Sequence, residues 1–532
     1  GHRQGNDMES QVATYSDDRF SDVYLKFTHL YSQTQVRETA QQVRIPEKVI
    51  RCIWNDQLIK TDELKTTDGE KIDILFPGYW NFGSGPDFTR IVIKVNGKTY
   101  EGDAEIHVYS KDWKAHKHSE NPEYDNVVLH VFMWKSAVKN RARKPKVAAN
   151  PARLPGAHIF ELELKTYLEK GILELTDTLD FDHYPIINKF NYGLCHEPLA
   201  RLPKAKLIHL LNLAGDARIL VKMERFHDRV IINGYEQTFY EGLAEALGYP
   251  SNKKQFQTLA ERLPLETLKK LLPATIKKKD RALHIQAMLL GVSGLIDFKT
   301  PAPEGLPTAD RKYFKRIETL WRTYKPRIAG PLMLGESWNF GQIRPANYPY
   351  RRIAGLSHLL VRHWPNGVFS DFMEYFNSIC SATGEKDDAA KTLQRAYQFL
   401  RAEAAGDYWS THYTPGGKEL PSAQQLIGAD RAREITINIM IPLGLIYARA
   451  SKSKPMEKAL KTLYQSGKGP PDNKMIRFMK HYILGDKTEM IKMLKTDKQH
   501  QGLMQVYQDY CTQNENNCLR CQFPEVVEQY FS

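Results

Sequence analysis

The fold of the N-terminal region is decided by the stretch IVIKVNGKTYEGDAEIHV, residues 91–108. From Ile91 to Val95 the side chains alternate with a period of two, which is typical of a β-strand. The dipeptide Asn96-Gly97 follows, and it is the strongest short signal for a two-residue hairpin turn. The stretch therefore predicts a β-hairpin whose second strand ends near residue 108.

Hydrophobic periodicity on both sides of this hairpin indicates further elements. Pro46 to Leu58 has apolar residues at helical spacing, and Lys71 to Phe76 alternates like a strand. Ser110 to Asn126 is polar and reads as a helix or a loop, whereas Val127 to Trp134 is an apolar run that should form a strand buried on both faces. The predicted order is helix, strand, hairpin, helix or loop, strand.

The remainder of the chain changes character. His158 to Leu164 is one more strand-like piece, and from about Leu202 the period becomes helical. Phe239 and Leu247 belong to one such helical pattern, which Gly248 closes. We expect an α+β protein, with an N-terminal αβββαβ core followed by a large, mainly α-helical region.

A length of 532 residues suggests three or four domains. Residues 1–8 resemble a vector-derived leader that ends at Met8. The expected divisions are an α/β domain at 9–138, a basic connector with one added strand at 139–200, a helical domain at 201–450, and a basic helical C-terminal region with a cysteine cluster at 451–532.

Composition limits the class of function. The chain has 75 Lys and Arg against 62 Asp and Glu, a formal net charge of +13, which favours polyanionic partners. Apolar runs are too short for a membrane span, and the six cysteines do not form a secreted disulfide framework, so we expect a cytoplasmic protein. The chain has no phosphate-binding, dinucleotide-binding or nucleophile-elbow glycine motif, so we expect no nucleotide cofactor.

The second strand of the hairpin carries the candidate chemistry. Period-two geometry places Asp103, Glu105 and His107 on one face, opposite an apolar face that must be core. A turn rich in glycine presents Asp87 at the mouth of this unit, within reach of Glu105. Neighbouring acids repel each other unless a cation or proton lies between them, so we expect Asp87 and Glu105 to bind Mg²⁺ or Mn²⁺. The alternative is that Asp87 caps a turn and the Glu105 face is a solvated surface.

The PD dipeptide at 86–87 and the EIH tripeptide at 105–107 resemble the motifs of the PD-(D/E)xK nuclease superfamily. The predicted αβββαβ order is similar to the restriction-endonuclease-like core of that superfamily. The resemblance implies that Asp87 and Glu105 bind the metal, and that His107 orients the attacking water or bears charge.

Two further features belong to this resemblance. His107 replaces the usual Lys, and a histidine is mostly neutral near pH 7, so it supplies less positive charge. The site is therefore either a weakened nuclease or a binding relic. An acid from the first helix often completes such sites, and Glu47 is the candidate here.

Four of the 17 histidines, at positions 107, 116, 118 and 130, gather in and after this strand. His116 and His118 share a face if their segment is extended but diverge on a helix, so their joint ligation of a metal depends on that conformation. They are alternatively phosphate contacts. His130 interrupts an apolar strand, where a hydrogen-bonded core histidine is the commoner case.

A wider resemblance covers nearly the whole chain. It rests on SGPDF at 84–88, GDAEIHV at 102–108, RPANYP at 344–349 and the terminal cysteines. Together these segments are similar to an uncharacterised bacterial family known only as domain of unknown function 2851. The resemblance implies that the N-terminal unit and the helical remainder occur together in one protein.

A second metal site is expected at the C-terminus. Cys511, Cys518 and Cys521 form a C-x6-C-x2-C pattern that suits a soft metal. The fourth ligand is missing locally, and Cys195 or a histidine such as His500 can supply it. The site then holds Zn²⁺ or an iron-sulfur cluster, and the alternative is that these cysteines only tie down a tail.

Basic residues are the candidates for nucleic-acid contact. Arg141, Arg143 and Lys144 lie in the connector, and Arg344, Arg351 and Arg352 lie in a run rich in aromatic residues. Planar cations beside stacking surfaces can hold single-stranded nucleic acid. The same mixture also occurs in loops that are anchored by aromatic packing and arginine pairs.

These observations lead to one main hypothesis and two alternatives. The main hypothesis is a metal-dependent phosphodiesterase, a nuclease of DNA or RNA, whose catalytic residues are Asp87, Glu105 and His107. The first alternative is a non-catalytic nucleic-acid-binding protein on a nuclease-like scaffold. The second is a metal-dependent hydrolase of small molecules.

Overall fold

The computed structural model describes Tyr24 and residues 45–81, 85–116, 118–136, 159–172, 175, 179, 192–248, 251–296, 307–341, 343–381, 389–402, 404, 406–467, 469, 474–485, 487–512, 518 and 521–531. Arg141, Arg143 and Lys144 of the expected connector lie outside these residues. Among the helices that are described, none combines the length and the apolar character needed to cross a bilayer.

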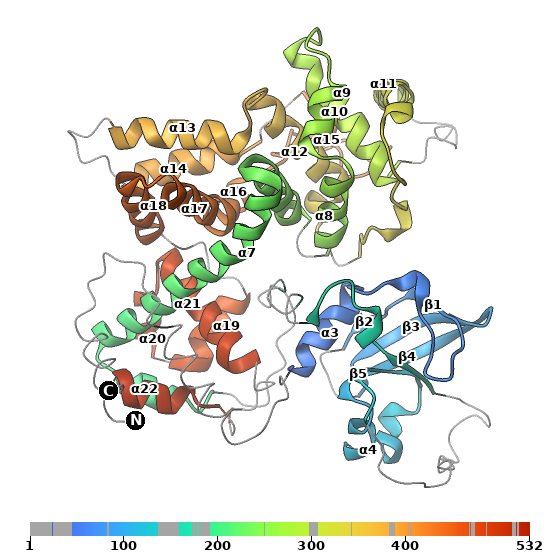
Figure 1. Ribbon diagram of the computed structural model, residues 1–532, viewed down its shortest axis with the longest axis vertical. Coiled ribbons are helices and arrows are strands. Elements are labelled where there is room, and N and C mark those ends of the chain that lie inside the picture. The colour runs from blue at the N-terminus through green and yellow to red at the C-terminus, as the bar shows by residue number, and fades with distance from the viewer. Residues whose placement is uncertain are drawn as a thin grey trace.

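A six-stranded sheet forms the N-terminal part of the molecule (Figure 1). Its strands run in the order β1-β3-β4-β5-β6, and β2 pairs with β3. The pairs among β1, β3 and β4 are antiparallel, whereas β4 with β5 and β5 with β6 are parallel. The bounds are β1 Ile72–Phe76, β2 Tyr79–Trp80, β3 Phe88–Val95, β4 Lys98–Tyr109, β5 Val127–Trp134 and β6 Phe160–Glu163.

The predicted hairpin is present as β3 and β4. Val95 pairs with Lys98, and the turn residues Asn96 and Gly97 have φ of 47° and 88°. Positive φ at both positions is what a type I′ turn requires, and it matches the right-handed twist of the strands. The register of the hairpin then fixes which side chains of β4 face the core.

The polar segment after β4 is mostly short helical turns. It contains α4 (Asp112–Ala115) and the 3₁₀ helices η2 (His118–Glu120) and η3 (Pro122–Tyr124). Parallel pairing of β4 with β5 requires the chain to cross over between them, and this segment is the crossover. It places the predicted residues His116 and His118 against β4.

The first predicted helix is α3, Glu47–Asn55, and it packs on β4. Its apolar stripe, which includes Val49, Ile53 and Trp54, is fully buried. Burial of such side chains contributes roughly 1.5–3 kcal/mol each, before conformational entropy is counted. The same helix carries Glu47 and Arg51 toward the sheet.

The rest of the described chain is helical, as expected. Its α-helices are α6 His196–Arg201, α7 Lys204–Leu247, α8 Lys253–Arg262, α9 Leu265–Leu271, α10 Lys278–Ser293, α11 Thr308–Tyr324, α12 Pro349–Arg362, α13 Val368–Ser381, α14 Ala389–Leu400, α15 Tyr408–Thr411, α16 Ala429–Ile435, α17 Ile441–Ala450, α18 Lys454–Ser466, α19 Lys474–Leu484, α20 Thr488–Met493, α21 Asp497–Val506 and α22 Phe523–Phe531. Two π-helical turns, η9 (Thr436–Met440) and η10 (Tyr507–Thr512), adjoin α17 and α21.

Helix α7 runs from the C-terminal helices α19 to α22 into the region of helices α8 to α18 (Figure 1). It is interrupted at Gly234, whose φ of 76° and ψ of 168° are not helical. From Ile219 onward its buried apolar residues belong to a hydrophobic core shared with α8 to α18. Up to Ala217 its buried apolar residues belong to a second core that also contains the sheet, α3 and the C-terminal helices, so the first strands and the last helices of the chain contribute to one core.

Close packing and a buried ion pair attach α21 to α7. Gly215 and Gly502 lie at the crossing, where an added Cβ on either residue would overlap the backbone of the other helix. Lys498 Nζ lies 2.9 Å from Asp216 Oδ1, and both residues are buried.

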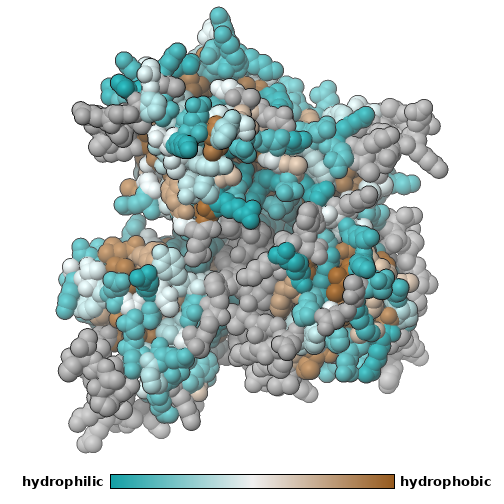
Figure 2. Space-filling model, turned by 180° about the vertical axis from the view of Figure 1, so that it is seen from behind, coloured by the Kyte–Doolittle hydropathy of each residue, from teal (hydrophilic) through white to brown (hydrophobic). Residues whose placement is uncertain are grey.

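On the face shown in Figure 2 the described residues are mainly hydrophilic, with small hydrophobic groups among them.

Candidate metal centre

Strand β4 carries Glu105 and His107 into the interior. Glu105 is 4% exposed and His107 is fully buried, while Ala104 and Ile106 are buried on the opposite face. The alternative of a solvated surface at Glu105 is therefore wrong. The cause is the crossover segment, whose residues cover this face of β4.

The structure brings Asp87 and Glu105 together. The backbone N–H of Asp87 donates to Glu105 Oε2 at 3.0 Å, and the backbone N–H of Ile106 donates to Asp87 Oδ2 at 3.1 Å. Each acid is thus bound by the backbone of the other segment. This reciprocal pair fixes the carboxylate of Glu105 relative to the start of β3.

Arg51, which the sequence analysis did not identify, completes this acid pair. Its Nε lies 2.9 Å from Asp87 Oδ2, and its Nη2 contacts Glu47 Oε1. Burial lowers the pKa of the guanidinium, but the carboxylates of Asp87 and Glu47 outweigh burial and raise that pKa above its ordinary value. Arg51 therefore supplies the positive charge that His107 does not.

The buried acids are poorly solvated. Burial raises the pKa of Asp87, although Arg51 opposes the shift. Burial and the neighbouring Asp87 raise the pKa of Glu105 to about 9. Because burial and Asp87 together outweigh the effect of Arg51 on Glu105, a cation next to Glu105 would stabilise its ionised form.

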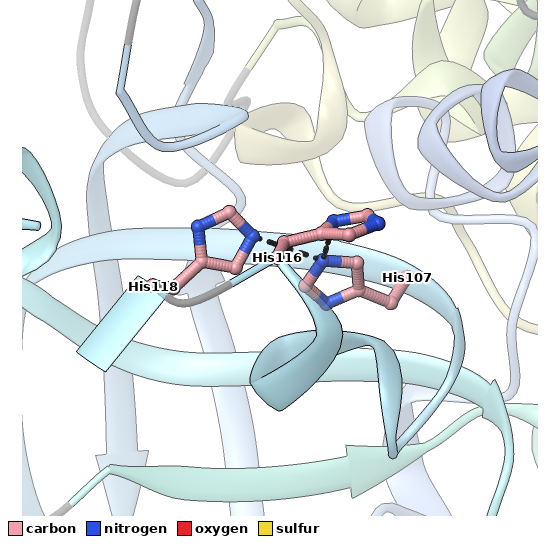
Figure 3. Close-up of side chains that lie close together, drawn as sticks. All are labelled: His107, His116 and His118. Carbon is pink, nitrogen blue, oxygen red and sulfur yellow. Dashed lines mark hydrogen bonds between the residues drawn. The ribbon is translucent and has the colours of Figure 1, made fainter. Parts of the chain in front are cut away.

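The histidines converge on the same point (Figure 3). His107 Nε2 lies 3.2 Å from His116 Nδ1 and 3.2 Å from His118 Nε2. Glu105 Oε1 lies 3.2 Å from His118 Nε2 and 3.6 Å from His107 Nε2. Glu105 Oε1, His107 Nε2 and His118 Nε2 thus lie within 3.6 Å of one another, and His116 Nδ1 adjoins them at His107.

These spacings fit a metal ion. Around a tetrahedral ion with ligand bonds of 2.0–2.1 Å, the donor atoms lie about 3.3 Å apart. The donor atoms of His107, His116 and His118 all lie within 4.8 Å of one another. Burial and the neighbouring histidines lower the pKa of His107 to about 2 and that of His118 to about 4, so both rings are neutral and able to ligate.

His107 contacts His130, which in turn lies near Glu161, and these two residues orient the ring of His107. Its Nδ1 lies 3.0 Å from His130 Nε2, and His130 Nδ1 lies 3.9 Å from Glu161 Oε1. Strands β4, β5 and β6 hold these residues side by side, since Glu105 pairs with His130 and His130 with Glu161. A hydrogen-bonded partner behind a ligating histidine fixes its tautomer and its orientation.

Aromatic rings enclose the cluster. The ring of Tyr124 lies 4.0 Å from that of His118, and the ring of Trp113 lies 5.1 Å from that of His130. Burial raises the pKa of the Tyr124 hydroxyl above its ordinary value. These rings reduce access of water to His118 and His130, and His116 is the exposed member of the set.

Three site residues were missed in the sequence, and each had a weak signal. Arg51 lies four residues after Glu47, the spacing of an ion pair on one helix face. Glu161 lies in the strand-like piece that pairs with β5. Tyr124 lies in the polar segment, whose conformation the sequence left open.

Asp103 does not join the centre. Its Oδ1 accepts the backbone N–H of Arg90 at 3.0 Å, and its Oδ2 accepts Asn126 Nδ2 at 3.0 Å. Arg90 has φ of 60° where the register of β3 and β4 shifts. Asp103 therefore stabilises the irregular backbone of β3 at Arg90, and its assignment as an additional site residue is corrected.

The proposed nucleic-acid contacts at residues 351 and 352 are also corrected. Arg351 is fully buried and donates to the carbonyls of Trp409, His412 and Gln425. Arg352 donates to the carbonyl of Leu426 at 2.9 Å. Both guanidinium groups anchor loops inside the helical region, whereas Arg344 is exposed.

The predicted cysteine site is a separate cavity. Cys195, Cys511, Cys518 and Cys521 line it together with Tyr482. His500 is engaged elsewhere, because its Nε2 lies 3.1 Å from the carbonyl of Leu494.

Comparisons with curated proteins and with solved structures found no match. A family model described as "Protein of unknown function (DUF2851)" matches residues 47–470. The match begins at the first residue of α3 and includes Glu105 and all four histidines of the centre. Because it spans most of the 532 residues, the chain belongs to this family.

Proposed function

We propose that this protein is a metal-dependent phosphodiesterase that cleaves DNA or RNA at the centre on β4. The observation that carries the proposal is the convergence of three imidazole nitrogens, with Glu105 Oε1 at 3.2 Å and 3.6 Å from those of His118 and His107, beside a buried acid pair held by an arginine. This geometry supports a hydrolytic site more directly than the motifs alone.

The donor set favours one kind of ion. His107, His116 and His118 would hold it, with Glu105 Oε1 beside His107 and His118 as a further ligand, and imidazole suits Mn²⁺ or Zn²⁺ better than Mg²⁺, which prefers oxygen ligands. In this proposal Asp87 positions Glu105, because Asp87 Oδ2 is already occupied by Arg51 and the N–H of Ile106. A divalent ion at such a site polarises a phosphoryl oxygen and lowers the pKa of water.

The residues around the ion have separate roles. His130 and Glu161 orient the ring of His107. Arg51 pairs with Asp87 and places a fixed positive charge beside the site, where negative charge develops on the phosphate. The rings of Trp113 and Tyr124 exclude water from the buried side.

The direct test is cleavage of labelled single- and double-stranded DNA and RNA with Mn²⁺, Zn²⁺ or Mg²⁺. We expect Mn²⁺ or Zn²⁺ to stimulate cleavage by the wild type, and His118→Ala to remove that stimulation. His227→Ala changes an exposed histidine of α7 and should behave as wild type. Tight binding without metal-stimulated cleavage would indicate the non-catalytic nucleic-acid-binding protein instead.

Replacing Arg51 with Met tests the electrostatic role. Arg51→Met keeps the aliphatic stem but leaves Asp87 without its cation, so we expect cleavage to fall by roughly a hundredfold and the free energy of unfolding to fall by about 1.5–3 kcal/mol. Urea unfolding and initial rates measure the two effects. Arg201→Met, which breaks an exposed pair with Glu197, should change neither, and an Arg51→Met protein with normal rates would contradict the role.

Salt dependence tests the nucleic-acid partner. A formal net charge of +13 predicts phosphate contacts that release counterions, so affinity should fall at least about tenfold when the salt concentration rises fourfold. Fluorescence anisotropy of a labelled oligonucleotide with an inactive variant measures it. Arg344→Ala should reduce the salt slope by about one, and an affinity independent of salt would contradict this partner.

A further inference from the structure

Four of the six cysteines meet in one place. Cys195, at the N-terminus of α6, lies at the same cavity as Cys511 of η10, Cys518, and Cys521 before α22. More than 300 residues separate Cys195 from the other three, so the fold itself brings the fourth thiol to the C-terminal cluster. All four are free cysteines.

The cavity is apolar apart from these thiols. The residues that line it are Leu194, Cys195, Tyr482, Ile483, Val506, Tyr510, Cys511, Cys518, Cys521 and Phe523. Burial raises the pKa of Cys195, and the thiols of Cys521 and Cys518 raise it further; burial also raises the pKa of Cys521 to about 11. A buried thiol can serve as a small apolar side chain, but four thiols around one cavity are the ligand set of a soft metal.

The distances between the four sulfur atoms indicate which kind of metal site they can form. Four thiolates around one Zn²⁺ with bonds of about 2.3 Å place their sulfur atoms about 3.8 Å apart. In the part of the chain that the structure describes, His107, His116 and His118 form a set of three donor atoms within 4.8 Å, and no three of the four sulfur atoms do. The thiols are therefore wider apart than a single zinc ion would hold them.

We propose that Cys195, Cys511, Cys518 and Cys521 ligate one iron-sulfur cluster. Such a cluster takes four cysteine thiolates and places iron and sulfide ions between them, which separates the sulfur atoms of the protein. Its surroundings suit it, because the cavity is shielded by Tyr482, Tyr510 and Phe523. The assignment does not depend on the phosphodiesterase at β4.

Tyr482 is the positioning residue of this site. Its hydroxyl lies 2.8 Å from Cys518 Sγ, and toward a thiolate only the hydroxyl can donate. A hydrogen bond to a ligating sulfur shifts the reduction potential of a cluster. Tyr482→Phe should therefore keep the cluster and change its potential.

The ligation also explains how the end of the chain is held. Cys518 and Cys521 both precede α22, and Cys195 precedes α6, which packs against α22. A cluster shared by these segments would fasten the last helix to the second core. Loss of the cluster should accordingly expose α22 to proteolysis.

The test is metal analysis of the full chain purified without oxygen from cells supplied with iron. We expect iron and acid-labile sulfide in nearly equal amounts, with visible charge-transfer absorption that bleaches with dithionite. Cys195→Ser and Cys521→Ser should lower the iron content by roughly tenfold or more, while Cys52→Ala, a buried cysteine of α3 outside the cavity, should keep it.

Each other outcome would overturn the assignment. Wild-type protein with one zinc per chain and no sulfide would identify a zinc site, and protein without metal after reconstitution with ferrous iron and sulfide would identify only buried thiols. Full iron content in Cys195→Ser would remove Cys195 from the ligands. If that variant does not fold, the metal content of the wild type decides between the cluster and zinc.

Discussion

Glu105→Gln should abolish metal-dependent cleavage while leaving the metal-free protein folded. The amide keeps the shape of the side chain and can still accept the N–H of Asp87. Burial has already raised the pKa of Glu105 to about 9, so the neutral amide resembles the form that the metal-free protein holds. The variant loses only the anionic oxygen that faces His107 and His118.

We expect affinity for Mn²⁺ or Zn²⁺ to fall at least about a hundredfold and the cleavage rate to fall about a thousandfold. Isothermal titration with the metal alone measures the first effect, and single-turnover cleavage measures the second. Glu101→Gln is the matched control, since Glu101 is exposed on the same strand. Metal affinity equal to that of the wild type in Glu105→Gln would refute the centre, even if the protein proved inactive on every substrate.

Lys498→Met should be among the most destabilising substitutions in the chain. The ammonium of Lys498 lies 2.9 Å from Asp216 Oδ1 inside the second core, where both side chains are at most 3% exposed. Lys498→Met removes this charge partner of buried Asp216, and breaking a buried ion pair in this way costs about 3–5 kcal/mol. The midpoint of urea unfolding should fall accordingly.

A double variant distinguishes lost charge from lost packing. Asp216→Asn combined with Lys498→Met removes both charges and should recover at least half of the loss, because no ion then remains uncompensated. Lys492→Met breaks an exposed pair with Glu489 and should not change the midpoint measurably. If the double variant is less stable than Lys498→Met alone, the loss comes from packing of α21 on α7.

Local patterns predicted the sheet well. Asn96-Gly97 determined the hairpin, and period two placed Glu105 and His107 on the same face of β4. The sequence did not give the parallel pairing of β5 with β6, because strand pairing depends on contacts between distant segments. The description of the chain as mixed α and β agrees with the structure, which adds β2 to the expected order.

The candidate site was predicted in part. The spacing of one hairpin brought Asp87 and Glu105 together, but the joint placement of His116 and His118 depends on the turn after α4, which has no periodic signal. Arg51 was missed because the hydrophobic periodicity of a helix predicts which of its faces is buried. It does not predict which other element, here the segment of Asp87, that face contacts. Arg351 and Arg352 were misassigned because composition cannot distinguish a guanidinium that solvates phosphate from one that satisfies buried carbonyls.

The shared second core has a consequence for biosynthesis. Ile106 of β4 and Val526 of α22 belong to that one core, yet about 420 residues of translation separate them. At about 5–20 residues per second, roughly 20–80 seconds pass between the synthesis of these two residues. The second core is incomplete during that interval, so we expect chaperones to bind the nascent chain at this stage and the native packing of this core to form only after the ribosome has released the chain.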